Sequence, residues 1–374
     1  AYRIFMNYMK INVLVIGGGT HHNALGVIRT LGISGYGVEL ITIGNLVKNY
    51  IASSKYILKH CALADIKELA AYLLYREPKS EKEIIISCAD AVTEHLNLYQ
   101  RKLSERYILP GIPMEGKMPE LMDKTNMIKM AAKRDIYSPE VWSLPMDITK
   151  VTFPCITKSY ISSHGGKSDI VICRNREELD TFLAGNKDTL FVQAYIDKKE
   201  EVQFIGCSLN NGEEIIIPGM TKVLRSQPNT NTGFLEYGPI DPFYDNIVKK
   251  SKLYIKDCQY SGLFSIEFLR GHDDKVYFLE INFRNDGNAY CVTASGINLP
   301  AIWVKANRGE NYYDEIKEPK FVVVMPEFQD LKLVLQCKVS LWQWLKDVKR
   351  TDVFLEYMKE DKRPFFQYII DKII

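Results

Sequence analysis

The chain contains GLFSIEFLRG (262–271) and KVYFLEINFRNDG (275–287), two apolar segments joined by a short polar turn. This pattern predicts a β-hairpin. A hairpin that is symmetric about the turn places Glu267 directly across from Glu280, with the two Cβ atoms roughly 4.5–5.5 Å apart. Because side chains alternate along a strand, Asn282 is expected on the same face as Glu280.

The predicted face of this hairpin combines polar and apolar side chains. Besides the two glutamates and Asn282, it is expected to carry Leu263, Leu269, Val276 and Phe278, so both carboxylates should be half-buried. Two close carboxylates repel each other unless a proton or a cation lies between them. Carboxylate and amide oxygens are hard ligands, which suit Mg²⁺ bridging to the phosphates of a nucleotide. The alternative is an acidic, solvated face on an ordinary hairpin. The hairpin alone does not decide between a metal site and such a face.

The composition is that of a globular protein. The chain has 374 residues, of which 46% are hydrophobic and 25% charged, and two or three domains are expected at this length. A net charge of +2 with scattered basic residues gives no reason to expect nucleic acid as a partner. No apolar run reaches the ~18 residues of a membrane span. The opening AYRIFMNYMK (1–10) lacks the long apolar region of a signal peptide.

The eight cysteines show no C-x-x-C spacing, and several lie in apolar runs. This usage is typical of small buried side chains in a reducing compartment. We therefore expect a cytoplasmic protein.

The first 115 residues alternate between apolar strands and helices. In order, strands and helices are expected at 11–18, 24–32, 37–44, 65–76, 83–90 and 92–107. Strands that alternate with helices predict a parallel α/β sheet. The glycines at 17–19 do not make a dinucleotide-binding fingerprint, because His22 occupies its third glycine position and no acidic residue follows the second strand. This argues against a nicotinamide-dependent oxidoreductase.

Prolines and glycines between residues 110 and 119 mark the end of this unit. The next helix is expected at 123–135, with Asp123 as its N-cap. Further strands and helices are expected at 153–160, 170–175, 176–185, 189–197, 201–209, 213–224 and 246–260. The tail, 340–374, has an amphipathic helical pattern and is expected to pack on the body or on a partner subunit.

Two segments in the middle of the chain suit a nucleotide. In FPCITKSYISSHGGKSD (153–169), Lys158 leaves a strand shortly before a Gly-rich loop. Glycines let backbone N–H groups approach a phosphate, and a lysine supplies a point charge; a flexible hairpin is the alternative. In QAYI (193–196), an extended linker exposes backbone groups that could bind an adenine edge, and Glu200 follows as an acceptor for ribose hydroxyls. An ordinary solvated loop is the alternative there.

The order and spacing of these segments resemble the ATP-grasp superfamily over about residues 10–310. The shared pattern is a DK pair that opens a helix, P-x-x-x-K, a Gly-rich loop, V-Q-x-Y-I with a later acid, and E-x(12)-E-x-N. The last motif is the most diagnostic.

The resemblance implies an α/β and α+β architecture with ATP between its second and third parts. These parts are an N-terminal Rossmann-like domain (1–115), a small lid subdomain (116–190) and a C-terminal antiparallel-sheet subdomain with the metal site (191–312). A C-terminal helical extension (313–374) would follow.

The resemblance also implies roles for individual residues. The residues that match nucleotide-binding positions are Lys124, Lys158, Gly165, Gly166, Gln193, Tyr195, Ile196 and Glu200. In that order they are two phosphate lysines, the phosphate loop, the adenine linker and the ribose-binding acid. The matches to the Mg²⁺ or Mn²⁺ ligands are Glu267, Glu280 and Asn282. Arg284 matches an arginine of the branch that includes biotin carboxylase and carbamoyl phosphate synthetase, where it faces the anionic reacting group.

Some positions remain open or depart from the family pattern. Lys222 and Arg225 lie where a further phosphate-contacting cation is often found, and solvated strand charges are the alternative. Ser265 replaces the arginine of D-alanine–D-alanine ligases, which argues against that branch. His21 and His22, at the end of the first strand, are candidates for contact with the second substrate.

The implied activity is that of an ATP-dependent carboxylate–amine ligase that forms an amide or peptide bond through an acyl phosphate. Its substrates would be a small-molecule carboxylate and an amine, its cofactors ATP and Mg²⁺ or Mn²⁺, and a homodimer is left open. The alternatives are a carboxyphosphate-using carboxylase and an ATP-binding regulatory or structural protein without turnover. The intact set of two lysines and three metal ligands argues against the last.

Overall fold

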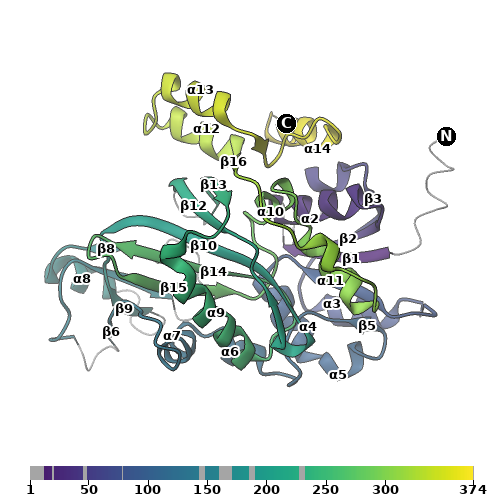
Figure 1. The fold of residues 1–374 in the computed structure, drawn as a ribbon, viewed down its shortest axis with the longest axis horizontal. Helices are drawn as coiled ribbons and strands as arrows, with labels where there is room; N and C mark the ends of the chain where they lie inside the picture. The colour runs from purple at the N-terminus through teal and green to yellow at the C-terminus, as the bar shows by residue number, and fades with distance from the viewer. Residues whose placement is uncertain are drawn as a thin grey trace.

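The computed structural model describes residues 12–18, 21–44, 49–77, 79–142, 148–159, 171–184, 190–226 and 232–373. Three sheets organise these residues (Figure 1). The first part of the chain forms a parallel sheet, drawn in purple. The middle of the chain forms a small antiparallel sheet, and a large sheet in teal and green lies between the two.

The first sheet has the strand order β3-β2-β1-β4-β5, with every pair parallel. Its strands are β1 (Asn12–Gly18), β2 (Gly37–Ile43), β3 (Ile57–Leu63), β4 (Glu83–Ser87) and β5 (Tyr107–Ile108). Its helices are α2 (His22–Ile33), α3 (Glu68–Tyr75), α4 (Asp90–Leu98) and α5 (Gln100–Leu103). Alternate residues of β1 enter two different hydrophobic clusters, one on each side of the sheet. A parallel sheet covered on both faces explains why β1 is a continuous apolar run.

Two expectations for this sheet were wrong. The helix expected at 92–107 ends at Leu98, and Tyr107 pairs with Glu83 as part of the edge strand β5. Strand β3 was not predicted, because its side chains at 58–60 are exposed and its segment lacks a long apolar run. In both cases pairing with a neighbouring strand, which is a tertiary contact, decides the structure.

The small sheet has the order β6-β9-β7-β8 and its own core. Its strands are β6 (Val141–Trp142), β7 (Cys155–Ser159), β8 (Ile172–Cys173) and β9 (Leu190–Ala194). The helices of this part of the chain are α6 (Met118–Leu121), α7 (Lys124–Ala132) and α8 (Arg176–Leu183). Helix α7 begins at the expected N-cap, where the Asp123 carboxylate accepts a hydrogen bond from the backbone N–H of Asn126 at 2.9 Å.

The large sheet has the order β15-β14-β10-β12-β13-β16-β17, and β11 pairs with β10. Its strands are β10 (Lys198–Leu209), β11 (Glu214–Ile216), β12 (Met220–Arg225), β13 (Phe234–Gly238), β14 (Gly262–Gly271), β15 (Val276–Asn282), β16 (Val322–Met325) and β17 (Val353–Phe354). The helices around it are α9 (Asp245–Cys258), α10 (Tyr290–Ala294) and α11 (Leu299–Asn307). The single strand expected at 213–224 is divided at Pro218, which has no N–H to donate to a ladder.

The C-terminal segment is not helical throughout. Its helices are α12 (Glu327–Leu335), α13 (Leu341–Arg350) and α14 (Arg363–Ile373), but β16 and β17 extend the large sheet beyond β13. The expectation of a helical tail was therefore wrong at residues 353–354. None of the helices in the described ranges is long and apolar enough to cross a membrane. The four domain limits expected from the sequence stay a prediction.

A buried ion pair fixes the C-terminal segment to the first sheet. Arg29 of α2 donates through Nε to Asp361 Oδ2 at 3.1 Å, and its other nitrogens donate to three backbone carbonyl oxygens of residues 355–361. Asp361 also accepts from Ser54 Oγ at 2.8 Å and from the backbone N–H of Lys55 at 3.0 Å. Both charged side chains are buried. Loss of either partner would leave a buried charge without its counter-ion.

We predict that Arg29→Met lowers the free energy of unfolding by about 3–5 kcal/mol, because Asp361 stays buried without its counter-ion. Urea denaturation followed by circular dichroism measures the change. The control is Arg176→Met in α8, whose ion pair with Asp180 is solvent-exposed and should contribute at most ~1 kcal/mol. Equal effects of the two substitutions would contradict the anchoring role of Arg29.

Candidate active site

The hairpin of β14 and β15 brings the predicted acidic residues together. Glu267 pairs with Glu280 and Ser265 pairs with Asn282, so the expected pairing is confirmed. Glu267 is 6% exposed, while the Glu280 side chain is 19% exposed. Both acids therefore lie on one partly buried face.

The apolar neighbours expected on this face were partly wrong. The register shifts between Glu267 and Phe268, which pairs with Phe278, so Leu279 is an extra residue on β15. An extra residue inverts the alternation of a strand. Phe278 and Val276 consequently enter the hydrophobic core of the opposite face together with Phe268. The bulge places the even-numbered side chains of β15 in the core up to Phe278 and on the polar face from Glu280 onward, while Ile281 continues the core.

Lys124 supplies a positive charge to the pair of acids. It is the first residue of α7, and its Nζ lies 3.2 Å from Glu280 Oε2. Burial disfavours the charge of this lysine, but Glu280, Glu267 and Asp90 together raise its pKa above the usual value. Lys124 is therefore cationic at neutral pH and offsets part of the repulsion between Glu267 and Glu280.

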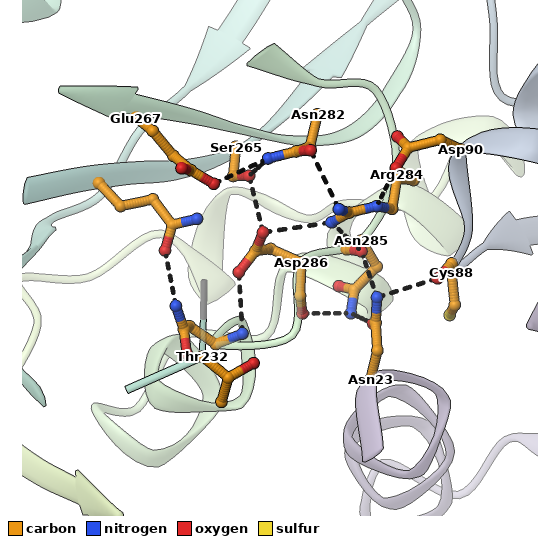
Figure 2. A network of polar contacts seen from close by, with 12 residues as sticks. Asn23, Cys88, Asp90, Thr232, Ser265, Glu267, Asn282, Arg284, Asn285 and Asp286 are labelled. Carbon is orange, nitrogen blue, oxygen red and sulfur yellow. Dashed lines mark hydrogen bonds and ion pairs between the residues drawn. The ribbon is translucent and has the colours of Figure 1, made fainter. Parts of the chain in front are cut away.

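The side-chain amide of Asn282 bridges Glu267 and Arg284. Its Nδ2 donates to Glu267 Oε1 at 3.0 Å and to Ser265 Oγ at 3.2 Å. Its Oδ1 accepts from Arg284 Nη2 at 3.0 Å. Figure 2 shows this chain of contacts running from Glu267 through Asn282 to Arg284.

Arg284 lies at the centre of the polar network in Figure 2. Its Nε donates to Asp90 Oδ2 at 3.2 Å, and its Nη1 donates to Asp286 Oδ2 and to the backbone oxygen of Asn285, both at 3.2 Å. Burial disfavours the charge, but Asp90 and Asp286 raise the pKa of the guanidinium above its usual value. With the bond to Asn282, four of its five N–H groups have acceptors among the described residues.

The sequence interpretation missed Asp90 and Asp286. Asp90 follows β4 at the carboxyl edge of the first sheet, and acidic residues at such an edge often face a ligand. That position is a signal that could have found Asp90. Asp286 is 3% exposed and accepts from Ser265 Oγ at 2.9 Å; its closeness to Arg284 in the sequence is the corresponding signal.

Asn285 joins the loop of Arg284 to the first sheet. Its backbone N–H donates to the carbonyl oxygen of Ser87 at 2.9 Å, and its side-chain Nδ2 donates to Asn23 Oδ1 at 2.5 Å. Asn23 Nδ2 donates in return to the carbonyl oxygens of Asn285 and Cys88. The position of Arg284 is thus set by both the first sheet and the large sheet.

The donor set suits a hard divalent cation that is shared with a substrate. Within the described ranges, no three His, Cys, Asp or Glu side chains form a group that could hold a metal ion by themselves. Glu267, Glu280 and Asn282 instead offer two carboxylates and an amide. Mg²⁺ is usually bound by one or two carboxylates together with substrate phosphates rather than by a complete protein cage. These residues fit such an ion.

The residues of the predicted adenine and ribose region lie on β9, β10 and the segment between them. Gln193 is buried, and its Nε2 donates to the backbone oxygen of Pro139 at 3.3 Å. Tyr195 and Ile196 are half-buried. Glu200 accepts from Tyr244 Oη at 2.6 Å. It also accepts from Arg270 Nη1 at 3.0 Å, and Lys222 Nζ lies 2.7 Å away.

Not every predicted site residue can be placed. Gly165 and Gly166 lie outside the described residues. Lys158 belongs to β7, where it pairs with Phe191, but its side chain is outside the described part of the chain. Arg225 forms ion pairs with Asp330 and Asp347 of the C-terminal helices, so two carboxylates engage its guanidinium.

The two histidines at the start of α2 lie beside the Arg284 loop. A Cβ atom on Gly287 would lie 3.0 Å from His21 Cε1 and 3.5 Å from His22 Nε2. Burial, with His21 adjacent, lowers the pKa of His22 well below its usual value. His22 Nδ1 lies 3.6 Å from Glu356 Oε1. Contact of these histidines with a second substrate stays a prediction.

Comparison with known proteins identifies the fold. A protein-family model described as "ATP-grasp in the biosynthetic pathway with Ter operon" matches residues 189–330. N5-carboxyaminoimidazole synthetase from Staphylococcus aureus is 16% identical, with a TM-score of 0.66 over 87% of this chain and 86% of that chain. L-amino acid ligase from Bacillus licheniformis is 13% identical, with a TM-score of 0.61 over 84% of this chain and 79% of that chain. No curated protein matches the chain.

A third similar structure contains ligands. The biotin carboxylase domain of 2-oxoglutarate carboxylase from Hydrogenobacter thermophilus is 15% identical, with a TM-score of 0.62 over 83% of this chain and 73% of that chain. That structure is a complex with MgADP, ADP and bicarbonate.

The chain has the fold of these structures, and its residues 189–330 match an ATP-grasp family model, in agreement with the resemblance that its motifs indicate. The expected fold class is confirmed, with a parallel sheet at the N-terminal end and antiparallel pairing in the sheets that follow, apart from the parallel pair β16 and β17.

We predict a pH effect at Glu200. Burial alone would raise the pKa of this carboxyl, but hydrogen bonds from Lys222, Tyr244 and Arg270 lower it from 4.5 to about 2. A folded-state pKa below the unfolded value stabilises the fold above about pH 4.5, and this contribution is lost as the pH falls toward 2. Glu200→Gln should flatten the pH dependence of the free energy of unfolding in this window, as measured by urea denaturation at about pH 6 and about pH 3.

The control for this prediction is Glu201→Gln, because Glu201 contacts the exposed Lys198 instead. This substitution should leave the pH dependence close to that of the unchanged protein. If Glu200→Gln also left it unchanged, the three donors would not be holding Glu200 in its ionised form.

Proposed function

We propose that the protein is an ATP- and Mg²⁺-dependent carboxylate–amine ligase, with Mn²⁺ as an alternative ion. It would form an amide or peptide bond through an acyl phosphate. The observation that carries the proposal is the contact of Arg284 with Asn282 beside the facing pair Glu267 and Glu280. A guanidinium that could hold an anion and oxygens that could hold a cation lie within one hydrogen-bond network.

The reaction needs two balanced steps. An oxygen of the substrate carboxylate attacks the γ-phosphorus of ATP, the bond to the β-phosphate oxygen breaks, and ADP leaves. The amine then attacks the acyl carbon, inorganic phosphate leaves with the electron pair of the C–O bond, and the nitrogen loses a proton. No covalent bond to the protein is required, so the side chains act by positioning and by offsetting charge.

The described residues would divide these tasks. Glu267, Glu280 and Asn282 would hold Mg²⁺, which when bound neutralises charge on the β- and γ-phosphates. The ammonium group of Lys124 would leave Glu280 and bind a phosphate oxygen instead. Arg284 would hold the substrate carboxylate through an N–H group. Asp90 and Asp286 would fix the orientation of the guanidinium.

Other parts of the proposal rest on the sequence motifs. Lys158, Gly165 and Gly166 are proposed to contact phosphate, and the segment from Gln193 to Ile196 to contact adenine. Glu200 would bind ribose, with Lys222 beside it. We retain the four sequence-based domain limits. Six of the eight cysteines are buried and none forms a disulfide, which supports a reducing, cytoplasmic location.

A carboxyphosphate-using carboxylase is the second candidate. The observation in its favour is the fold similarity to N5-carboxyaminoimidazole synthetase and to a biotin carboxylase domain. In that reaction bicarbonate would replace the organic carboxylate. The two candidates therefore differ in the anion that Arg284 would hold.

We predict that Glu280→Gln lowers ADP release on the order of a hundredfold or more, because a charged ligand of the phosphate-bound cation is lost. ADP release is measured with pairs of carboxylates and amines, with bicarbonate included as one of the carboxylates. The control is Glu120→Gln, a substitution in an exposed ion pair with Lys117. Circular dichroism checks that both variants are folded.

Full ADP release by folded Glu280→Gln would contradict the metal assignment. Release with bicarbonate and no organic carboxylate would favour the carboxylase. Tight binding of Mg-ATP without release for any pair would favour the regulatory protein.

A further inference from the structure

The orientation of the Asn282 amide is fixed by its two charged neighbours. Its NH₂ group faces the Glu267 carboxylate and its oxygen faces the Arg284 guanidinium, each at 3.0 Å. The reverse orientation would place oxygen against a carboxylate and NH₂ against a cation that carries only donors. Asn282 is 3% exposed, so the amide has little access to water as a substitute partner.

In this orientation Asn282 cannot coordinate a cation beside Glu267, because its NH₂ group rather than its oxygen faces that side. A cation is coordinated by the amide oxygen, because the NH₂ group carries only donors. In the described structure that oxygen is bound to Arg284. To offer it to a cation beside Glu267, the amide must turn by half a rotation, which places NH₂ against the guanidinium. Two donors cannot form a hydrogen bond, so Arg284 Nη2 must then leave Asn282.

Departure of Nη2 changes what Arg284 can bind. With Asn282 in place, one N–H group of Nη2 is left without an acceptor among the described residues, because the other four N–H groups are engaged. Without Asn282, both N–H groups of Nη2 become available. Nε and Nη1 remain bonded to Asp90, Asp286 and the Asn285 carbonyl, so the guanidinium pivots about these contacts and only Nη2 moves away from Asn282. Both N–H groups of Nη2 can then donate to an anion, whereas only one could do so before.

We propose that Asn282 is a positioning residue for Arg284, whose amide rotation makes the carboxylate site depend on metal binding. This inference rests on the proposed function, since it requires a cation with nucleotide beside Glu267. Metal and carboxylate binding are then coupled, and each strengthens the other. Both N–H groups of Nη2 face a substrate carboxylate only after the metal–nucleotide complex is present, which delays its binding until phosphoryl transfer can follow.

The test is a pair of crystal structures of the full chain, one with ADP alone and one with Mg-ADP. We expect the Arg284 Nη2–Asn282 Oδ1 contact of 3.0 Å to remain with ADP alone. With Mg-ADP it should lengthen beyond hydrogen-bonding distance, above about 3.5 Å. Mg²⁺ bound at Glu267 with the contact intact would overturn this inference and leave the proposed function standing. In the Mg-ADP crystal, bound nucleotide with no Mg²⁺ at Glu267 would overturn both.

Asn282→Asp is the matched variant. A carboxylate has an acceptor on each side, so Asp at this position can face a cation and Arg284 at the same time without rotation. The variant should bind Mg-ADP, as measured by isothermal titration calorimetry, and its Mg-ADP crystal structure should retain the contact with Arg284. Loss of that contact in the variant would show that amide rotation is not the cause of release, and the inference would fail.

Discussion

Two carboxylates that face each other across one hairpin are the constraint on which the site depends. Glu267 and Glu280 form a cross-strand pair on β14 and β15, in a partly buried position where like charges repel strongly. The protein meets this constraint with donors and cations from three directions. Lys124 approaches from the start of α7, and the Asn282 amide lies on the same strand as Glu280. Arg284 contacts this amide through its oxygen. Each of these groups is also suited to a nucleotide, a metal or an anion.

The same network joins parts of the chain that are far apart in sequence. Arg284 follows β15 of the large sheet, and its partner Asp90 begins α4 beside the first sheet, 194 residues away. The backbone bond from Asn285 to Ser87 and the paired amides of Asn285 and Asn23 lie next to this contact. The position of a single guanidinium therefore depends on correct docking of the two sheets. The fold supports the site by holding that interface closed with short, buried hydrogen bonds.

Much of the fold and part of the site could be predicted from local patterns. The pairing of Glu267 with Glu280 was predicted from a turn centred between Asp273 and Asp274, but the pairs next to the turn are centred on Asp273, and the extra residue Leu279 produces the predicted pair. The cap of α7 at Asp123 follows from residue type. The predicted alternation of side chains between the two faces of β15 was wrong at Leu279, where the strand has a bulge. A bulge depends on how a strand twists against its neighbours and leaves no local signal in the sequence. The strands β3, β5 and β17 lie at sheet edges, where pairing rather than composition determines structure. The role of Asp90 was missed because it arises only when two distant segments meet.

The C-terminal segment has a mechanical consequence. It is held to the first sheet through Arg29 and Asp361 and to the large sheet through Arg225, Asp330 and Asp347. A segment tied at both ends in this way acts as a strut that resists hinge motion between the two bodies that carry Asp90 and Arg284. The small sheet has a separate core and lies away from this strut (Figure 1). The strut therefore opposes a change in the distance between the first sheet and the large sheet.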